Sequence, residues 1–391
     1  MDYSTTKNQI PHSAILLRLL KTKSGFTRKR DAEAFLRKWL VELDENRYVE
    51  PTKETFASYM EYWFTTHYQK RIKESTISNR KYAMDKHLIR ENPFANKELS
   101  KISTEMIDAL YNDKLDEGYS TNTIRKIHQM LNQAFKQAIK WKKVAHNPVI
   151  DADPPAVKTK EAKIWSFEEI HTFLAHCKEE RHYITFLLAI YTGMRRGEIL
   201  GLKWSDIDFE KKIIRVERTL IHIPGNGYQF SSPKTFKSKR QVHIPDQILD
   251  DLVFHKEQQE QWKEIFGQEY QDNNLVVCTE KGTIQDPRNV LRVLKRLCET
   301  AKVTKIRFHD IRHTHASILI AKNVDIVKVA NRLGHSKAKT TLDYYAHLIP
   351  NDQDEVANIF HNSLMHKKEA IVSIPSKERS KEEILIQTKN F

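Results

Sequence analysis

The feature that most constrains how this chain can fold is an interruption in an apolar run, at Thr192-Gly193-Met194-Arg195. The run before it, from Ile184 to Tyr191, is apolar enough to form a buried helix. Gly193 is typical of the residue at which such a helix ends, and a second helix is expected to begin after Arg195. The arginine is therefore expected to face the break between two helices.

A second polar motif, Phe308-His309-Asp310-Ile311-Arg312-His313-Thr314-His315, opens another predicted helix, because apolar residues follow it. His309 and Arg312 are three residues apart, so both lie on one face near the start of that helix. Downstream come Leu333-Gly334-His335 and then Tyr344-Tyr345-Ala346-His347. The C-terminal half thus presents arginine, histidine and tyrosine side chains in a fixed order.

These residue types suit chemistry at a phosphate. A guanidinium grips a phosphate through two hydrogen bonds, and an imidazole can move a proton near neutral pH. A tyrosine hydroxyl can attack phosphorus and leave a covalent phosphoester. Between the arginine motifs, Pro233-Lys234-Thr235 opens a lysine-rich segment before the strand-like run from Arg240 to Pro245.

In this order, the arginine, lysine, His-x-x-Arg, histidine and tyrosine motifs resemble those of the tyrosine recombinase, or phage integrase, family, over roughly Lys163 to His361. The resemblance implies a 3′-phosphotyrosyl intermediate and a released 5′-hydroxyl that attacks the partner strand. It also implies one role for each residue: Arg195 and Arg312 as the phosphate clamp, Lys234 as the general acid, His309 as the proton shuttle, His335 as a hydrogen-bond donor to phosphate and Tyr345 as the nucleophile.

Two adjacent pairs leave a choice of residue. The family pattern Thr-Gly-x-Arg assigns the clamp to Arg195 rather than Arg196. Tyr344 and Tyr345 would point about 100° apart on a helix, so only one can reach the scissile phosphate. Members of the family usually have a small residue and a histidine after the tyrosine, which favours Tyr345.

The general acid has competitors on its own segment. The Pro-Lys-Thr context favours Lys234, but Lys237 and Lys239 remain alternatives. Other polar residues near the motifs are expected to pack, hydrogen-bond or orient their neighbours: His313, His315, His347, Glu198 and Asp310.

Metal chemistry is the rival explanation for DNA breakage. A loose cluster of His171, His176, Cys177 and His182 fits no common zinc spacing, and a helix would spread it over several faces. A two-metal site needs converging carboxylates, whereas the predicted pocket is rich in cations. The sequence therefore predicts neither a metal nor a cofactor, and no Gly-rich loop that would bind ATP is present.

Composition indicates a polyanionic partner. The 391 residues include 65 Lys and Arg against 51 Asp and Glu, a formal net charge of +14. Counterion release by such a protein favours strong, salt-sensitive binding to DNA. The three cysteines are too few for a disulfide framework, and the apolar run from Ala14 to Leu20 is short and contains Arg18. No signal peptide or membrane span is expected, and the expected location is the bacterial cytoplasm, on the nucleoid when DNA is bound.

The expected fold is multidomain and mainly α, a helical core-binding domain plus a mixed α+β catalytic domain with a small antiparallel sheet. Strands are predicted near 212–218, 228–232 and 240–244. The expected boundaries, in chain order, are these: 1–50, an arm-type DNA-binding segment; 52–150, the helical (SAM-like) core-binding domain; 151–162, a linker with paired prolines; 163–365, the catalytic domain; and 366–391, a C-terminal tail.

Apolar stripes support the helical part of this division. One stripe contains Phe56, Met60, Trp63 and Phe64, a second contains Ile107, Leu110 and Tyr111, and a third contains Ile124, Ile127, Leu131, Phe135 and Ile139. All are expected in the core. Within 1–50, a basic run precedes one predicted helix, but the three-stranded sheet usual in arm-type modules has too few strand-like residues before that helix.

The resemblance implies a site-specific recombinase of a temperate phage or conjugative element, which integrates and excises DNA. Its partners would be double-stranded attachment-site DNA, three further copies of the chain in a homotetramer, an excisionase and a host DNA-bending protein. Two alternatives remain. One is a Xer-like resolvase of chromosome or plasmid dimers, and the other is a catalytically silent DNA-binding regulator.

Overall fold

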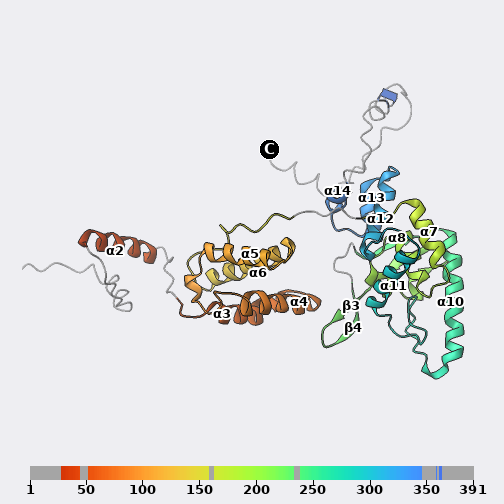
Figure 1. Cartoon of the computed structure of the whole chain (residues 1–391), viewed down its shortest axis with the longest axis horizontal. Helices are drawn as coiled ribbons and strands as arrows, with labels where there is room; N and C mark the ends of the chain where they lie inside the picture. The colour runs from red at the N-terminus through yellow and green to blue at the C-terminus, as the bar shows by residue number, and fades with distance from the viewer. Residues whose placement is uncertain are drawn as a thin grey trace, which may run out of the picture. The chain divides into compact units, whose positions relative to one another are not determined.

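The computed structural model describes residues 28–44, 52–157, 163–232 and 238–345, together with 358 and 361–362. The chain divides after Lys160 into two compact units, the N-terminal unit and the C-terminal unit, except that Ile223–Gly225 are assigned to the first. The described residues are mainly helical with short antiparallel strands, which confirms the predicted fold class (Figure 1). None of their helices is long and apolar enough to cross a membrane.

The N-terminal unit contains helices that begin at hydroxyl side chains. Thr55, Ser103 and Ser120 each accept a hydrogen bond from a backbone N–H in the first turn of the helix that follows. The helices are α2 (Lys29–Asp44), α3 (Phe56–Trp63), η1 (Phe64–Tyr68), η2 (Gln69–Arg71), α4 (Glu74–Met84), η3 (Asp85–Arg90), η4 (Leu99–Lys101), α5 (Thr104–Asp116) and α6 (Thr121–Lys140).

The predicted apolar stripes form one core between α3, α5 and α6. Phe56 stacks on Phe135 at 6.3 Å between ring centroids, and the Tyr59 hydroxyl donates to the Ala134 carbonyl oxygen at 2.7 Å. One residue of the third stripe was predicted wrongly. Ile139 is 37% exposed, because Ala138 beside it completes the buried face near the end of α6.

The C-terminal unit is built around apolar helices and two small sheets. The Ser166 capping box that opens α7 pairs the Ser166 hydroxyl with the Glu169 N–H at 3.2 Å. The helices are α7 (Phe167–Cys177), α8 (Tyr183–Thr192), α9 (Arg196–Leu200), η5 (Trp204–Asp206), α10 (Asp246–Phe266), η7 (Gly267–Glu269), α11 (Pro287–Thr300), α12 (Phe308–Ala321), α13 (Ile326–Leu333) and α14 (Ala338–Tyr345).

The strands form a three-stranded and a two-stranded sheet. In the larger, β2 (Ile213–Val216) lies between β1 (Ile207–Asp208) and β5 (Arg240–His243), all antiparallel. In the smaller, β3 (Thr219–Ile223) pairs with β4 (Gly227–Ser231). The predicted strands at 212–218, 228–232 and 240–244 are confirmed as β2, β4 and β5, whereas β1 and β3 were not predicted.

Candidate active site

The break between α8 and α9 has the geometry that its sequence predicts. Gly193 has a φ of +63°, in the left-handed region, and caps α8. A Cβ atom there would come within 2.8 Å of His315 and of Leu333, so only glycine fits. The turn places Arg195 as the N-cap residue of α9.

Arg195 belongs to a row of alternating charges. Its Nη1 donates to Glu198 Oε1 at 2.8 Å, and Arg240 Nη2 donates to Glu198 Oε2 at 2.9 Å. Burial would raise the pKa of Glu198, but the two guanidinium groups lower it below its usual range. Glu198 therefore holds Arg195 in place, which confirms the orienting role predicted for this carboxylate.

Arg312 on α12 is buried, with 3% of its surface exposed. Its Nη1 donates to the Gly193 carbonyl oxygen at 2.8 Å and its Nη2 to the Leu333 carbonyl oxygen at 2.5 Å. These two carbonyls close the C-terminal ends of α8 and α13, where the helix dipole favours a cation. Burial and the neighbouring guanidinium groups of Arg195 and Arg240 lower the pKa of Arg312 to about 9.

His309 and His335 share the electrostatic environment of both arginines. Burial, followed by the charges of His313, Arg312 and Arg195, lowers the pKa of His309 to about 4. Burial and the positive charges of Arg312 and Arg195 likewise lower the pKa of His335 to about 4. His335 Nδ1 also lies 2.9 Å from the Thr341 hydroxyl. Both imidazoles are therefore neutral near pH 7 before any phosphate is present.

Tyr345 is the last residue of α14 and is only 3% exposed. Its ring packs in a small cluster with Ala316, Ile320, Val329 and Leu333. Its hydroxyl lies 2.5 Å from Nδ1 of His313. The phenol also affects the pKa of Arg312, which its negative charge would raise. The nucleophile candidate thus lies beside one of the two clamp candidates.

The remaining predicted residues divide into three groups. Arg196 turns away from the site and donates to the Pro287 carbonyl oxygen at 3.3 Å, while Lys239 pairs with Glu217 at 3.0 Å. Hydrogen bonds confirm the hydrogen-bonding role predicted for His315, whose Nδ1 lies 2.9 Å from the Ile190 carbonyl oxygen, and the orienting role predicted for Asp310, which accepts from Arg307 at 2.7 Å. Three residues lie outside the described part of the chain: Lys234, Lys237 and His347.

The fold brings to the site two residues that the sequence motifs did not place there, Arg240 and His313. Arg240 was expected only as the start of a strand, and nothing in its sequence context marks it as buried. His313 was expected to make a local hydrogen bond. It does so, but its partner is the hydroxyl of Tyr345, 32 residues away. The adjacency of His313 to Arg312 was the available signal.

The loose cluster of His171, His176, Cys177 and His182, on α7 and at the start of α8, does not converge. His176 Nε2 lies 2.8 Å from the Thr300 hydroxyl, Cys177 is buried, and burial lowers the pKa of His182 to about 4. Among the described residues, no three His, Cys, Asp or Glu side chains are arranged to hold a metal ion.

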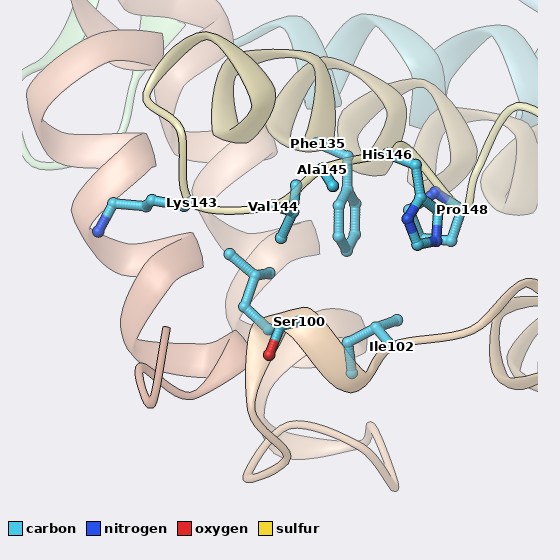
Figure 2. A pocket seen from close by; sticks show the side chains of 9 residues that line it. Ser100, Ile102, Phe135, Lys143, Val144, Ala145, His146 and Pro148 are labelled. Atoms are coloured by element: carbon cyan, nitrogen blue, oxygen red, sulfur yellow. The ribbon is translucent and has the colours of Figure 1, made fainter. Parts of the chain in front are cut away.

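A small pocket in the N-terminal unit is unrelated to this site. It measures about 150 Å³ and lies between apolar side chains, among them Ile102, Phe135 and Val144 (Figure 2). Lys143 at its edge extends away from the Phe135 ring in Figure 2 and bonds to Glu54 at 2.5 Å. Besides these apolar side chains, Ser100 and His146 also line the pocket.

Known proteins share the sequence patterns of both units. Residues 164–351 match the phage integrase family, and residues 55–115 match the phage integrase N-terminal SAM-like domain. The XerC-like tyrosine recombinase of Caldanaerobacter subterraneus subsp. tengcongensis is 33% identical over 340 residues, 82% of this chain and 86% of the relative. The ICEBs1 integrase of Bacillus subtilis is 30% identical over 288 residues, 73% of this chain and 77% of the relative.

Solved structures show the same fold. The Tn1549 transposon integrase, in complex with a circular intermediate DNA, matches with a TM-score of 0.68 at 18% identity, over 79% of this chain and 99% of that one. A lambda integrase dimer bound to a COC′ core site matches with a TM-score of 0.54 at 19% identity, over 74% of this chain and 95% of that one.

Proposed function

The chain belongs to the phage integrase family of tyrosine recombinases, and we propose that it cuts and rejoins DNA at specific sites to integrate and excise a mobile element. In this proposal, the Tyr345 oxygen attacks the scissile phosphorus as the bond to the 5′-oxygen breaks. Lys234 gives a proton to that oxygen, and a 3′-phosphotyrosyl bond remains. The free 5′-hydroxyl of the partner strand then reverses the step.

The observation that carries this proposal is the arrangement around Arg312. Its guanidinium bonds to the carbonyl of Gly193, two residues before Arg195, and to the carbonyl of Leu333, two residues before His335. Three separate motifs of the sequence thus meet at one cationic centre. Fixed positive charge of this kind stabilises the extra negative charge of a five-coordinate phosphorus, with His309 moving protons and His335 donating a hydrogen bond.

The proposed division of labour follows the two units. Residues 52–150 would bind core-site DNA as a helical domain and residues 163–365 would catalyse, with 151–162 as the linker between them. Residues 1–50 would bind distal arm sites, and 366–391 would pack on a neighbouring subunit. The Tn1549 integrase bound to circular intermediate DNA and the lambda integrase bound to a core site support a DNA partner for this chain. A homotetramer follows because two duplexes have four strands to cut. An excisionase and a host DNA-bending protein would set the direction.

A nicked suicide substrate tests this proposal. Cleavage of such a substrate releases a short fragment, so the covalent adduct accumulates and is resolved on a denaturing gel. Tyr345→Phe removes one oxygen and should abolish the adduct while leaving DNA binding intact. Tyr344→Phe is the matched control and should still form it. An adduct that persists in Tyr345→Phe and disappears in Tyr344→Phe would reassign the nucleophile, and no adduct from the unaltered chain would favour the silent regulator.

The similarity to the XerC-like relative supports one alternative function, the resolution of chromosome or plasmid dimers. The two activities differ in their sites. A resolvase recombines two identical sites on one plasmid, whereas an integrase joins two different attachment sites. Recombination of paired plasmids that carry the DNA flanking the gene distinguishes them.

A further inference from the structure

The closest polar neighbour of the Tyr345 hydroxyl among the described hydrogen bonds is His313. Its Nδ1 lies 2.5 Å from the phenol oxygen, and the two rings are 5.7 Å apart between centroids at an angle of 54°. The tyrosine comes from α14 and the histidine from α12, so the contact depends on the tertiary fold. The contact thus places an imidazole nitrogen beside the atom that would attack phosphorus.

The surroundings favour the neutral form of this imidazole. Burial lowers the pKa of His313 below its ordinary value, the negative charge of Asp310 opposes that shift, and the charges of Arg307 and Arg312 add to it. A neutral ring with its proton on Nε2 offers the Nδ1 lone pair to the phenol. His309 packs edge-on against the same ring, with centroids 5.0 Å apart at 90°. The three side chains therefore form a row from the nucleophile to the proton shuttle.

We propose that His313 is a catalytic residue, the base that takes the proton of Tyr345 during strand cleavage and returns it during rejoining. The inference rests on the proposed function, because it requires Tyr345 as the nucleophile. In cleavage, the O–H bond of Tyr345 breaks and its proton passes to Nδ1. The bond from the phenol oxygen to phosphorus forms while the 5′-oxygen leaves with a proton from Lys234. Rejoining runs the same transfers in reverse, so His313 acts as an acid at the departing phenol.

Two substitutions separate proton transfer from simple positioning. His313→Asn puts an amide oxygen near the position of Nδ1, so it can still accept the Tyr345 hydrogen bond but cannot take its proton. His313→Ala removes both the hydrogen-bond acceptor and the proton acceptor. If His313 is the base, both variants should form the adduct more slowly by about 10²- to 10⁴-fold in single-turnover reactions at saturating DNA. If His313 only positions the phenol, His313→Asn should stay within a few fold of the unaltered protein.

A more acidic nucleophile provides the decisive test of whether Tyr345 needs a base. Incorporation of 3,5-difluorotyrosine at position 345 lowers the pKa of the phenol, so the phenolate forms without a strong base. This replacement should restore most of the rate lost in His313→Asn and little of the rate lost in Lys234→Ala. A substrate with sulfur as the bridging 5′ atom should behave in the opposite way, because it removes the need for an acid at the leaving group.

Controls keep the outcomes distinct. His171→Asn, on an exposed residue of α7, should not change the rate of adduct formation. DNA binding and circular dichroism of each variant report whether it is folded. If His313→Ala does not fold, the His313→Asn result alone decides whether His313 is the base. A normal rate in His313→Asn, or no rescue by difluorotyrosine, would overturn the base assignment alone. An adduct that survives in Tyr345→Phe would overturn the proposed nucleophile, and the assignment of His313 with it.

Discussion

Arg195 and Arg312 would both stabilise the transition state, but they differ in what else depends on them. Arg195→Ala should slow adduct formation by about 10²- to 10³-fold, as the loss of one charge-stabilising donor does in other phosphoryl and acyl transfer sites. Binding should weaken much less, since ground-state affinity is spread over many phosphate contacts. Adduct formation on a suicide substrate and a gel-shift titration measure the two effects.

Arg312→Ala and Arg196→Ala are the variants with which Arg195→Ala is compared. Arg312→Ala should also lower the free energy of unfolding, because it leaves the carbonyls of Gly193 and Leu333 without their donor, at about 1–3 kcal/mol for each unsatisfied group. Arg196→Ala should cleave almost normally, since that side chain bonds to the Pro287 carbonyl instead. Equal losses in Arg195→Ala and Arg196→Ala would contradict the clamp assignment.

Single residues mark the limit of what the sequence could predict. The Thr-Gly-x-Arg and His-x-x-Arg motifs identified Arg195 and Arg312 because their spacing is local. The bonds from Arg240 to Glu198 and from His313 to Tyr345 join segments 42 and 32 residues apart, and no local pattern encodes them. Such contacts follow from how α12, α14 and β5 pack, which only the tertiary structure reveals.

Among the elements, helices were predicted well where an apolar stripe had a clear cap. The stripes of α3, α5 and α6, capped by Thr55, Ser103 and Ser120, are examples. Short strands were harder, because β1 has two residues and pairs only within the three-stranded sheet. The 21-residue helix α10 was not placed individually, since its buried residues are few and are separated by charged ones.

The junction of α8 and α9 supplies a prediction at this scale. Gly193→Ala forces an L side chain into the left-handed region, at about 1–2 kcal/mol, and overpacks His315 and Leu333, at about 1–3 kcal/mol more. The free energy of unfolding of the C-terminal unit should fall by the sum, as measured by urea denaturation. Cleavage should fall as well, because Arg195 and the Arg312 bond to Gly193 shift together.

Gly227→Ala is the matched control. Gly227 also has a positive φ, +73°, but nothing lies within 4 Å of the Cβ it would gain. It should therefore lose only the strain contribution and keep its cleavage rate. If both alanine variants lose the same stability, crowding at Gly193 is not what fixes the junction.

At the scale of the whole molecule, charge was the most reliable guide. A net charge of +14 indicates a polyanionic partner independently of any motif. Composition cannot say where the charge acts, and the described structure locates part of it in the buried pair of Arg240 and Glu198 and in the buried Arg312. Those charges serve the site and the fold, so phosphate contacts away from the site would use other lysines and arginines.

The neutral histidines of the site imply that DNA binding is linked to proton uptake. In the free protein, the pKa of His309 and that of His335 are about 4, against an ordinary 6.5. Burial disfavours their protonation most, followed by the charges of His313, Arg312 and Arg195 at His309 and of Arg312, Arg195, His309 and Arg240 at His335, whereas Asp310 favours the protonation of His309. A docked phosphate brings negative charge into the same space and should raise both pKa values. Between about pH 4 and 6.5 the complex then holds more protons than its separated parts.

Isothermal titration calorimetry in buffers of different ionisation enthalpy counts these protons. Near pH 5.5, binding of a core-site duplex should take up protons, and the apparent affinity should rise as pH falls from 7, about tenfold for each pKa unit regained. His309→Asn should reduce the uptake. A heat of binding that does not depend on the buffer would contradict the linkage. His309 and His335 would thus become positively charged only when the enzyme binds DNA, because the scissile phosphate stabilises their protonated forms.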